Sequence, residues 1–135
     1  MVIDSSAVVA IFLNEPDWPF LHNQILATDA RFISAVSVVE TGMVLESRLG
    51  GIAVRDFKHY LEGLNIEVVA IDPGMAWSAL AAWRRYGKGR HPAKLNLGDC
   101  FSYALAQSTG EPLLAKGGDF ALTDLVLCPS APTAP

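Results

Sequence analysis

The chain has 135 residues, of which 51% are hydrophobic and 18% charged, and fourteen acidic residues outnumber ten basic ones to give a formal net charge of −4. The length suits one domain, and the high apolar content excludes a disordered chain. The negative charge argues against a simple cationic nucleic-acid binder, and no run approaches the roughly 18 consecutive apolar residues of a membrane helix.

Short apolar runs alternate with amphipathic stretches along the whole chain. Runs of apolar, often β-branched residues predict strands, and apolar residues at helical spacing predict helices. In chain order we predict a strand at 2–4, helices at 7–13 and 18–26, a strand at 31–34, helices at 36–49 and 54–64, a strand at 66–71, a helix at 75–86, a basic loop at 87–96, a helix at 99–108, and strands at 112–115 and 126–128.

Several of these helices carry recognisable end residues. The side-chain oxygens of residues 4–6 can cap the first helix, and Asp17 can cap the second. Ser37 and Glu40 have the spacing of a capping box at the start of the long helix. Gly50 then ends that helix, because glycine readily adopts the left-handed backbone of a helix terminus.

Apolar strands separated by helices predict an α/β fold, namely a single domain over residues 1–128 with a parallel sheet of four to five strands flanked by helices on both faces. Residues 129–135 are rich in Pro, Ala and Ser and have little to bury, so we expect a flexible C-terminal tail. Cys100 and Cys128 form no CxxC pair, and residues 1–4 lack the basic start of a signal peptide. We therefore expect reduced thiols and a cytoplasmic location.

Four acidic residues stand beside apolar segments, where acids are unusual. Asp4 ends the first strand, Glu40 lies in an otherwise apolar helix, Asp99 opens another, and Asp119 follows the strand at 112–115. Each acid alone can be explained as a helix cap. Because the ends of parallel strands meet at one edge of a sheet, we also expect three or four of them to converge.

Converging carboxylates repel one another unless a cation offsets their charge. Oxygen ligands without a nearby His or Cys cluster favour Mg²⁺ or Mn²⁺ over zinc. A cation held in this way can polarise a phosphodiester and activate water, so the acids predict a metal-dependent hydrolase that needs no nucleophilic side chain.

Four motifs then point to a known family. They are MVIDSSA at residues 1–7, SAVSVVE at 34–40, LNLGDCFSYA at 95–104 and LLAKGGDF at 113–120, and YGKGRHP at 86–92 is also typical. In this order and spacing, up to about Leu127, the sequence resembles the PIN-domain ribonucleases, specifically the VapC-type toxins of bacterial toxin–antitoxin pairs. The resemblance implies a PIN-like fold, a Mg²⁺-dependent endoribonuclease acting on RNA, a cognate VapB-type antitoxin and a homodimer. The lack of a long apolar run separately predicts no membrane association.

The resemblance also implies roles for individual residues. Asp4 and Asp99 are then the principal metal ligands, and Glu40 helps hold the metal or orients the water. Asp119 matches a fourth, more variable acid that acts directly or through water. Ser5 matches a small hydroxyl position that can hold a carboxylate or a phosphate.

Half of the basic residues lie in one window that contains no acid. They are Arg84, Arg85, Lys88, Arg90 and Lys94. This window can guide RNA phosphates towards the metal, with Arg84, Arg85 and Arg90 as the main contacts, or it can be a solvated helix end whose bases complement the helix dipole. Lys116 can likewise contact a phosphate or pair with an acid of the site.

Two other functions remain open from the residues alone. A receiver-type phosphotransfer domain would use Asp4, Asp72 and Lys116 with Mg²⁺, although it needs neither Glu40 nor Asp99. A catalytically silent interaction module on the same fold is the second alternative, although all four acids are present.

Overall fold

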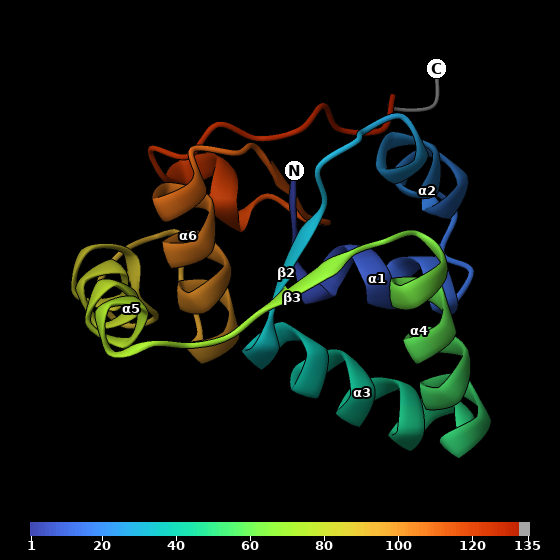
Figure 1. Cartoon of the computed structure of the whole chain (residues 1–135). Helices are drawn as coiled ribbons and strands as arrows, with labels where there is room; N and C mark the ends of the chain where they lie inside the picture. Colours follow the sequence, from blue (N-terminus) through green and yellow to red (C-terminus); the bar gives the residue numbers. More distant parts are fainter. Residues whose placement is uncertain (133–135) are drawn as a thin grey trace.

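A four-stranded parallel sheet forms the centre of the molecule in a computed structural model that describes residues 1–132 (Figure 1). Its strands are β1 (Val2–Ile3), β2 (Phe32–Ser34), β3 (Glu67–Val69) and β4 (Leu113–Leu114). Their order across the sheet is β3-β2-β1-β4, and every neighbouring pair is parallel. The carboxyl end of β1 therefore lies in the middle of one sheet edge, and Asp4 follows it directly.

Helices cover both faces of this sheet, which confirms the predicted α/β fold. They are α1 (Ser5–Phe12), α2 (Trp18–Leu26), α3 (Ala35–Leu49), α4 (Gly51–Gly63), α5 (Pro73–Tyr86) and α6 (Leu97–Thr109), with a short 3₁₀ helix η1 (Asp119–Leu122). In Figure 1, α5 and α6 lie together on one side of the sheet, and α2 and α4 lie on the other. None of the helices in residues 1–132 is both long and apolar enough to span a membrane.

The two faces of the sheet organise two cores. Successive strand residues point to opposite faces, so Val2 packs among residues of α5 and α6 whereas Ile3 packs among residues of α1, α2 and α4. Both side chains are fully buried. Because β1 is buried on both faces, packing from two sides fixes its position. Asp4 is the next residue in the chain, so its backbone position is fixed as well.

Two predicted strands differ from the structure. Only Glu67–Val69 of the predicted strand 66–71 pairs with β2, and Val68 is 46% exposed because β3 is an edge strand with one neighbour. The segment 126–128 forms no strand, since Leu127 makes only an isolated bridge to Leu113. The sheet thus has four strands, the lower of the two predicted numbers.

The domain boundary at residue 128 and the flexible tail at 129–135 stay predictions. The amide of Gln24 donates a hydrogen bond to the carbonyl of Pro129 at 2.9 Å. Residues 133–135 lie outside the described part of the chain.

Side chains of Asp4 and Ser34 cap the first and third helices. Asp4 caps α1 as predicted, because its carboxylate accepts a hydrogen bond from the Ser6 amide at 3.0 Å. The predicted capping box of Ser37 and Glu40 is wrong: Ser34 caps α3 by accepting from the amide of Val36 at 3.2 Å. Ser37 and Glu40 therefore lie inside α3, where their side chains are available for contacts with other helices.

The cap predicted at Asp17 also differs from the structure. Asp17 occupies the first position before α2, but its side chain makes no capping hydrogen bond there. Its carboxylate instead accepts from the ammonium of Lys116 at 3.0 Å. A charged partner from a distant loop thus takes the place of the local backbone amide.

We predict that Gly110→Ala lowers the free energy of unfolding by about 1 kcal/mol, because Gly110 ends α6 in the left-handed region at φ 71°, where a β-carbon is strained. Urea unfolding followed by circular dichroism measures the change. Gly63→Ala is the control, since Gly63 has ordinary helical backbone and open space for a methyl group, and it should lose no stability.

Candidate active site

Asp4 is the most deeply buried of the four acids, with 1% of its surface exposed. Its oxygen Oδ2 accepts the Ser6 amide of α1, and its oxygen Oδ1 accepts the hydroxyl of Ser102 from α6 at 2.6 Å. A buried carboxylate is costly unless donors satisfy it. These two donors, one from each side, let Asp4 occupy the interior at the end of β1.

Two neighbours set the position of the Glu40 carboxylate, namely the hydroxyl of Ser5 and the glycine at position 98. The hydroxyl of Ser5 donates to Glu40 Oε1, so the small residue beside Asp4 holds a carboxylate. A β-carbon at Gly98 would collide with the carboxylate of Glu40. Gly98 therefore leaves room for the Glu40 carboxylate at the start of α6, and a larger residue there would make the Glu40 side chain move.

Asp99 combines a structural and an electrostatic role at the start of α6. It forms a capping box with Asn96: the Asn96 side chain accepts from the Asp99 amide at 2.9 Å, and Asp99 Oδ2 accepts from the Asn96 amide at 3.0 Å. The pKa of the Asp99 carboxyl is raised to about 6, mainly by burial and also by the negative charges of Asp4, Glu40 and Asp119, while the Asn96 hydrogen bond lowers it.

The structure therefore brings Asp4, Glu40 and Asp119 within electrostatic reach of Asp99. Asp119, the first residue of η1, is the exposed member of the group and follows Gly117 and Gly118. No salt bridge within residues 1–132 involves any of the four acids. Their mutual repulsion is thus left uncompensated by the described side chains.

The chemistry of this group fits a hard divalent cation. Its donors are all oxygens, and a bound cation would offset the negative charges that, together with the larger effect of burial, raise the pKa of Asp99. Among the described residues, no three or more His, Cys, Asp or Glu side chains come together as a ready set of metal ligands. Mg²⁺ does not require such a set, because it keeps several waters and binds directly to one or two carboxylates.

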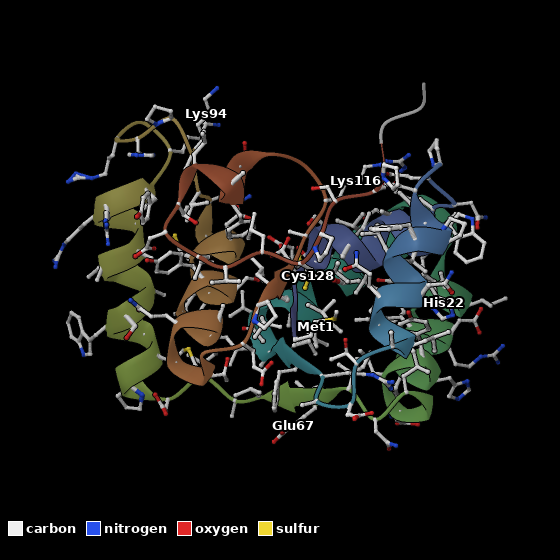
Figure 2. The ribbon with its side chains drawn as sticks, turned by 90° about the horizontal axis from the view of Figure 1, so that it is seen from above. Met1, His22, Glu67, Lys94, Lys116 and Cys128 are labelled. Carbon is white, nitrogen blue, oxygen red and sulfur yellow. The ribbon has the colours of Figure 1, made fainter. Side chains whose placement is uncertain are left out.

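Two of the five predicted basic residues interact with neighbouring side chains. Arg85 pairs with Asp124 at 3.3 Å, and the guanidinium of Arg90 lies over the ring of Trp83, 4.6 Å from its centre. Arg84, Lys88 and Lys94 are exposed. Figure 2 shows Lys94 in the loop after α5, well apart from Lys116.

Lys116 has partners that the sequence did not predict. Its ammonium pairs with Glu15 and Asp17, which belong to the turn between α1 and α2, and these hydrogen bonds raise the pKa of Lys116. Its backbone amide donates to the hydroxyl of Ser6 at 3.0 Å. Lys116 thus fastens the loop after β4 to α1 and pairs with none of the four acids.

Sequence reasoning missed four residues that shape the site, namely Ser37, Asn96, Gly98 and Ser102. Two of them had a usable pattern. Ser102 stands three residues after Asp99, and Ser37 three residues before Glu40, so each shares a helix face with an acid. A small polar residue on the buried face of an apolar helix indicates a hydrogen-bonding partner in the interior.

The receiver-type alternative does not agree with these positions. The carboxylate of Asp72 caps α5 by accepting from the Met75 amide at 2.7 Å. Lys116 is paired with Glu15 and Asp17. Neither residue is available to complete a phosphotransfer pocket around Asp4.

Comparison with known proteins identifies the class. The model of the PIN domain matches residues 1–125, almost the full length of the chain. The chain therefore belongs to the PIN-domain family.

Its relatives within that family are VapC ribonucleases. The chain is 49% identical over 125 residues to Ribonuclease VapC of Mycolicibacterium smegmatis, covering 93% of this chain and 97% of the relative. It is 46% identical over 125 residues to Ribonuclease VapC30 of Mycobacterium tuberculosis, covering 93% and 95%. These similarities place the chain among the VapC ribonucleases and confirm the family predicted from the four motifs.

Two solved structures share the fold at low sequence identity. VapC20 of Mycobacterium tuberculosis, a toxin that cleaves the sarcin–ricin loop, superposes with a TM-score of 0.78 at 17% identity, covering 93% of this chain and 95% of that one. A toxin–antitoxin complex from Klebsiella pneumoniae matches with a TM-score of 0.72 at 18% identity, covering 96% and 97%. Both support the architecture of a PIN domain.

We predict that Asp99→Asn stabilises the metal-free protein at pH 8 and that this advantage disappears by pH 4. The folded protein keeps the Asp99 proton up to about pH 6, whereas the unfolded chain releases it near 3.8. The wild type therefore loses stability as the pH rises through this interval, while the uncharged asparagine does not. Melting temperatures in EDTA across this pH range measure the difference, and an advantage that does not change with pH would contradict the electrostatic explanation.

Proposed function

We propose that this chain is the toxin of a type II toxin–antitoxin pair and acts in the cytoplasm as a Mg²⁺-dependent endoribonuclease, with Mn²⁺ as an alternative cation. The observation that carries the proposal is that Asp4, Glu40 and Asp119 lie within electrostatic reach of Asp99, and that no base within residues 1–132 forms a salt bridge with any of the four. The relatives named as VapC ribonucleases support RNA as the substrate.

In this proposal Asp4, which follows β1, and Asp99, in the first turn of α6, hold the cation. When bound, the cation polarises the RNA phosphodiester and activates a water molecule for its hydrolysis. Glu40, held by Ser5, accepts a hydrogen bond from the attacking water and so orients it. Asp119 contributes from the exposed side, directly or through water.

The basic window supplies the phosphate contacts in this proposal. Arg84 and Arg90 are exposed, and bases gathered in one stretch attract the RNA backbone electrostatically. Arg85 and Lys116 already pair with acids, so their proposed phosphate contacts require an exchange of partners. We therefore assign the larger share of binding to Arg84 and Arg90.

The proposed partners are a cognate VapB-type antitoxin and a second copy of this chain. The structural neighbour from Klebsiella pneumoniae is a toxin–antitoxin complex, which supports an antitoxin partner. Large apolar side chains stand exposed on α3, α5 and the start of α6, namely Val39, Met43, Trp77 and Leu97. Exposed apolar surface of this kind is typical of protein interfaces and supports a homodimer.

We predict that Asp4→Asn and Asp99→Asn each reduce RNA cleavage at least 100-fold, because each removes a charged oxygen ligand from the cation. Cleavage of total RNA, with sequencing of the new ends, measures the loss, and EDTA should abolish wild-type cleavage in the same assay.

Asp29→Asn is the matched control, since Asp29 is an exposed aspartate in the loop before β2. It should cleave as the wild type does. Wild-type cleavage by folded Asp4→Asn and Asp99→Asn variants would exclude the metal-nuclease mechanism.

We predict that the double variant Arg84→Ala and Arg90→Ala binds RNA more weakly in EDTA, where no cleavage occurs. Losing two phosphate contacts should reduce the slope of log affinity against log salt by about 1.4 for single-stranded RNA. Fluorescence anisotropy over a salt series measures this slope.

The control replaces Arg55 and Lys58, two exposed bases on α4 at the opposite side of the molecule from α5 (Figure 1). That pair should leave the slope near its wild-type value. Equal slopes for all three proteins would assign the basic window to helix stabilisation.

A further inference from the structure

A row of buried hydroxyl groups leads from α3 through α6 to Asp4. The hydroxyls of Ser37 and Ser102 lie 3.2 Å apart, and the hydroxyl of Ser102 donates to Asp4 Oδ1 at 2.6 Å. Ser37 and Ser102 are both 0% exposed. The row therefore lies in the interior, where its hydroxyl groups are not in contact with solvent.

The direction of this hydrogen-bond row follows from counting protons. A serine hydroxyl carries one proton, and Ser102 donates it to Asp4. Ser37 must then be the donor in its bond with Ser102. Each bond polarises the next, so Ser37 strengthens the bond that Ser102 makes to Asp4.

The row also links the helices that carry the other acids. Ser102 lies one turn after Asp99 in α6, and Ser37 lies one turn before Glu40 in α3. Residues three apart share a helix face, so each serine reaches inward from the face that carries an acid. The hydroxyl row thus fixes Asp4 relative to the two helices that hold Asp99 and Glu40.

A third buried hydroxyl shows that burial alone does not produce this arrangement. Thr41 lies in α3 one turn after Ser37 and is 0% exposed, yet its hydroxyl has no hydrogen-bond partner. Thr41 therefore provides an internal comparison. Its hydroxyl lies in the same helix as Ser37 and is equally buried, but it makes no hydrogen bond that leads to an acid.

We propose that Ser102, supported by Ser37, is a positioning residue that fixes the orientation of the Asp4 carboxylate for a divalent cation. This inference rests on the proposed function, because it assigns Asp4 as a ligand. With Oδ1 held by Ser102 and Oδ2 held by the Ser6 amide, the carboxylate has one orientation. Partners that orient a metal ligand in this way contribute substantially to metal affinity.

The test measures Mn²⁺ affinity by isothermal titration calorimetry, in the absence of RNA, for the wild type and three variants. Ser102→Ala should weaken Mn²⁺ binding roughly 10- to 100-fold, as is typical when the hydrogen-bond partner of a metal ligand is removed. Ser37→Ala should weaken it less, because Ser102 still donates to Asp4. Thr41→Val, the matched control, should bind Mn²⁺ with wild-type affinity.

A fourth variant separates hydrogen bonding from packing. Ser102→Thr retains the hydroxyl but adds a methyl group to a filled interior, so it should lower the melting temperature. Its Mn²⁺ affinity should nevertheless exceed that of Ser102→Ala. In cleavage assays, Ser102→Ala should lower kcat and leave the KM for RNA unchanged, because the phosphate contacts are elsewhere.

The outcomes distinguish this inference from the proposed function. A wild-type protein that binds no Mn²⁺ would overturn the proposed function and the positioning role together. Wild-type Mn²⁺ affinity in folded Ser102→Ala would overturn the positioning role alone. If Ser102→Ala does not fold, equal Mn²⁺ affinities of Ser37→Ala and Thr41→Val would overturn it instead.

Discussion

The repulsion among carboxylates at the carboxyl edge of the sheet is the constraint on which the rest of the site depends. Asp4 must lie there because it follows the central strand β1, and Glu40, Asp99 and Asp119 are brought to it by α3, α6 and η1. No base within the described residues 1–132 forms a salt bridge with these acids. Asp4, Glu40 and Asp99 are each stabilised by neutral donors, namely hydroxyls and backbone amides. Neutral donors satisfy the oxygens and leave the net negative charge in place for a cation.

The bases are placed consistently with that constraint. Lys116 lies in the same loop as Asp119 but is paired with Glu15 and Asp17, and Arg85 is paired with Asp124. Each pair joins separate elements of the chain while keeping a positive charge from the four acids. The formal net charge of −4 is therefore distributed unevenly: negative charges gather around Asp99, while Arg84, Lys88, Arg90 and Lys94 of the basic window are exposed.

The sequence predicted most of the fold and the four acids, because these depend on local patterns. A short apolar run followed by Asp-Ser-Ser indicates both a strand and a helix cap, so Asp4 could be placed without any tertiary information. The predicted strand at 66–71 was too long because an apolar run does not reveal whether a strand is central or at an edge. The partners of Lys116 and the contact between Ser102 and Asp4 join residues about a hundred positions apart, and no local pattern encodes them.

The double use of Asp99 determines how genetic experiments on this protein are to be interpreted. Its carboxylate is both an acid of the site and the acceptor that completes the capping box of α6. Replacement by alanine would remove both the charge and the capping hydrogen bond of α6. A loss of activity in that variant could therefore come from either change. Asparagine keeps an oxygen for the Asn96 amide and removes only the charge. An inactive Asp99→Asn variant is therefore informative about the role of the charge, whereas an inactive Asp99→Ala variant is not.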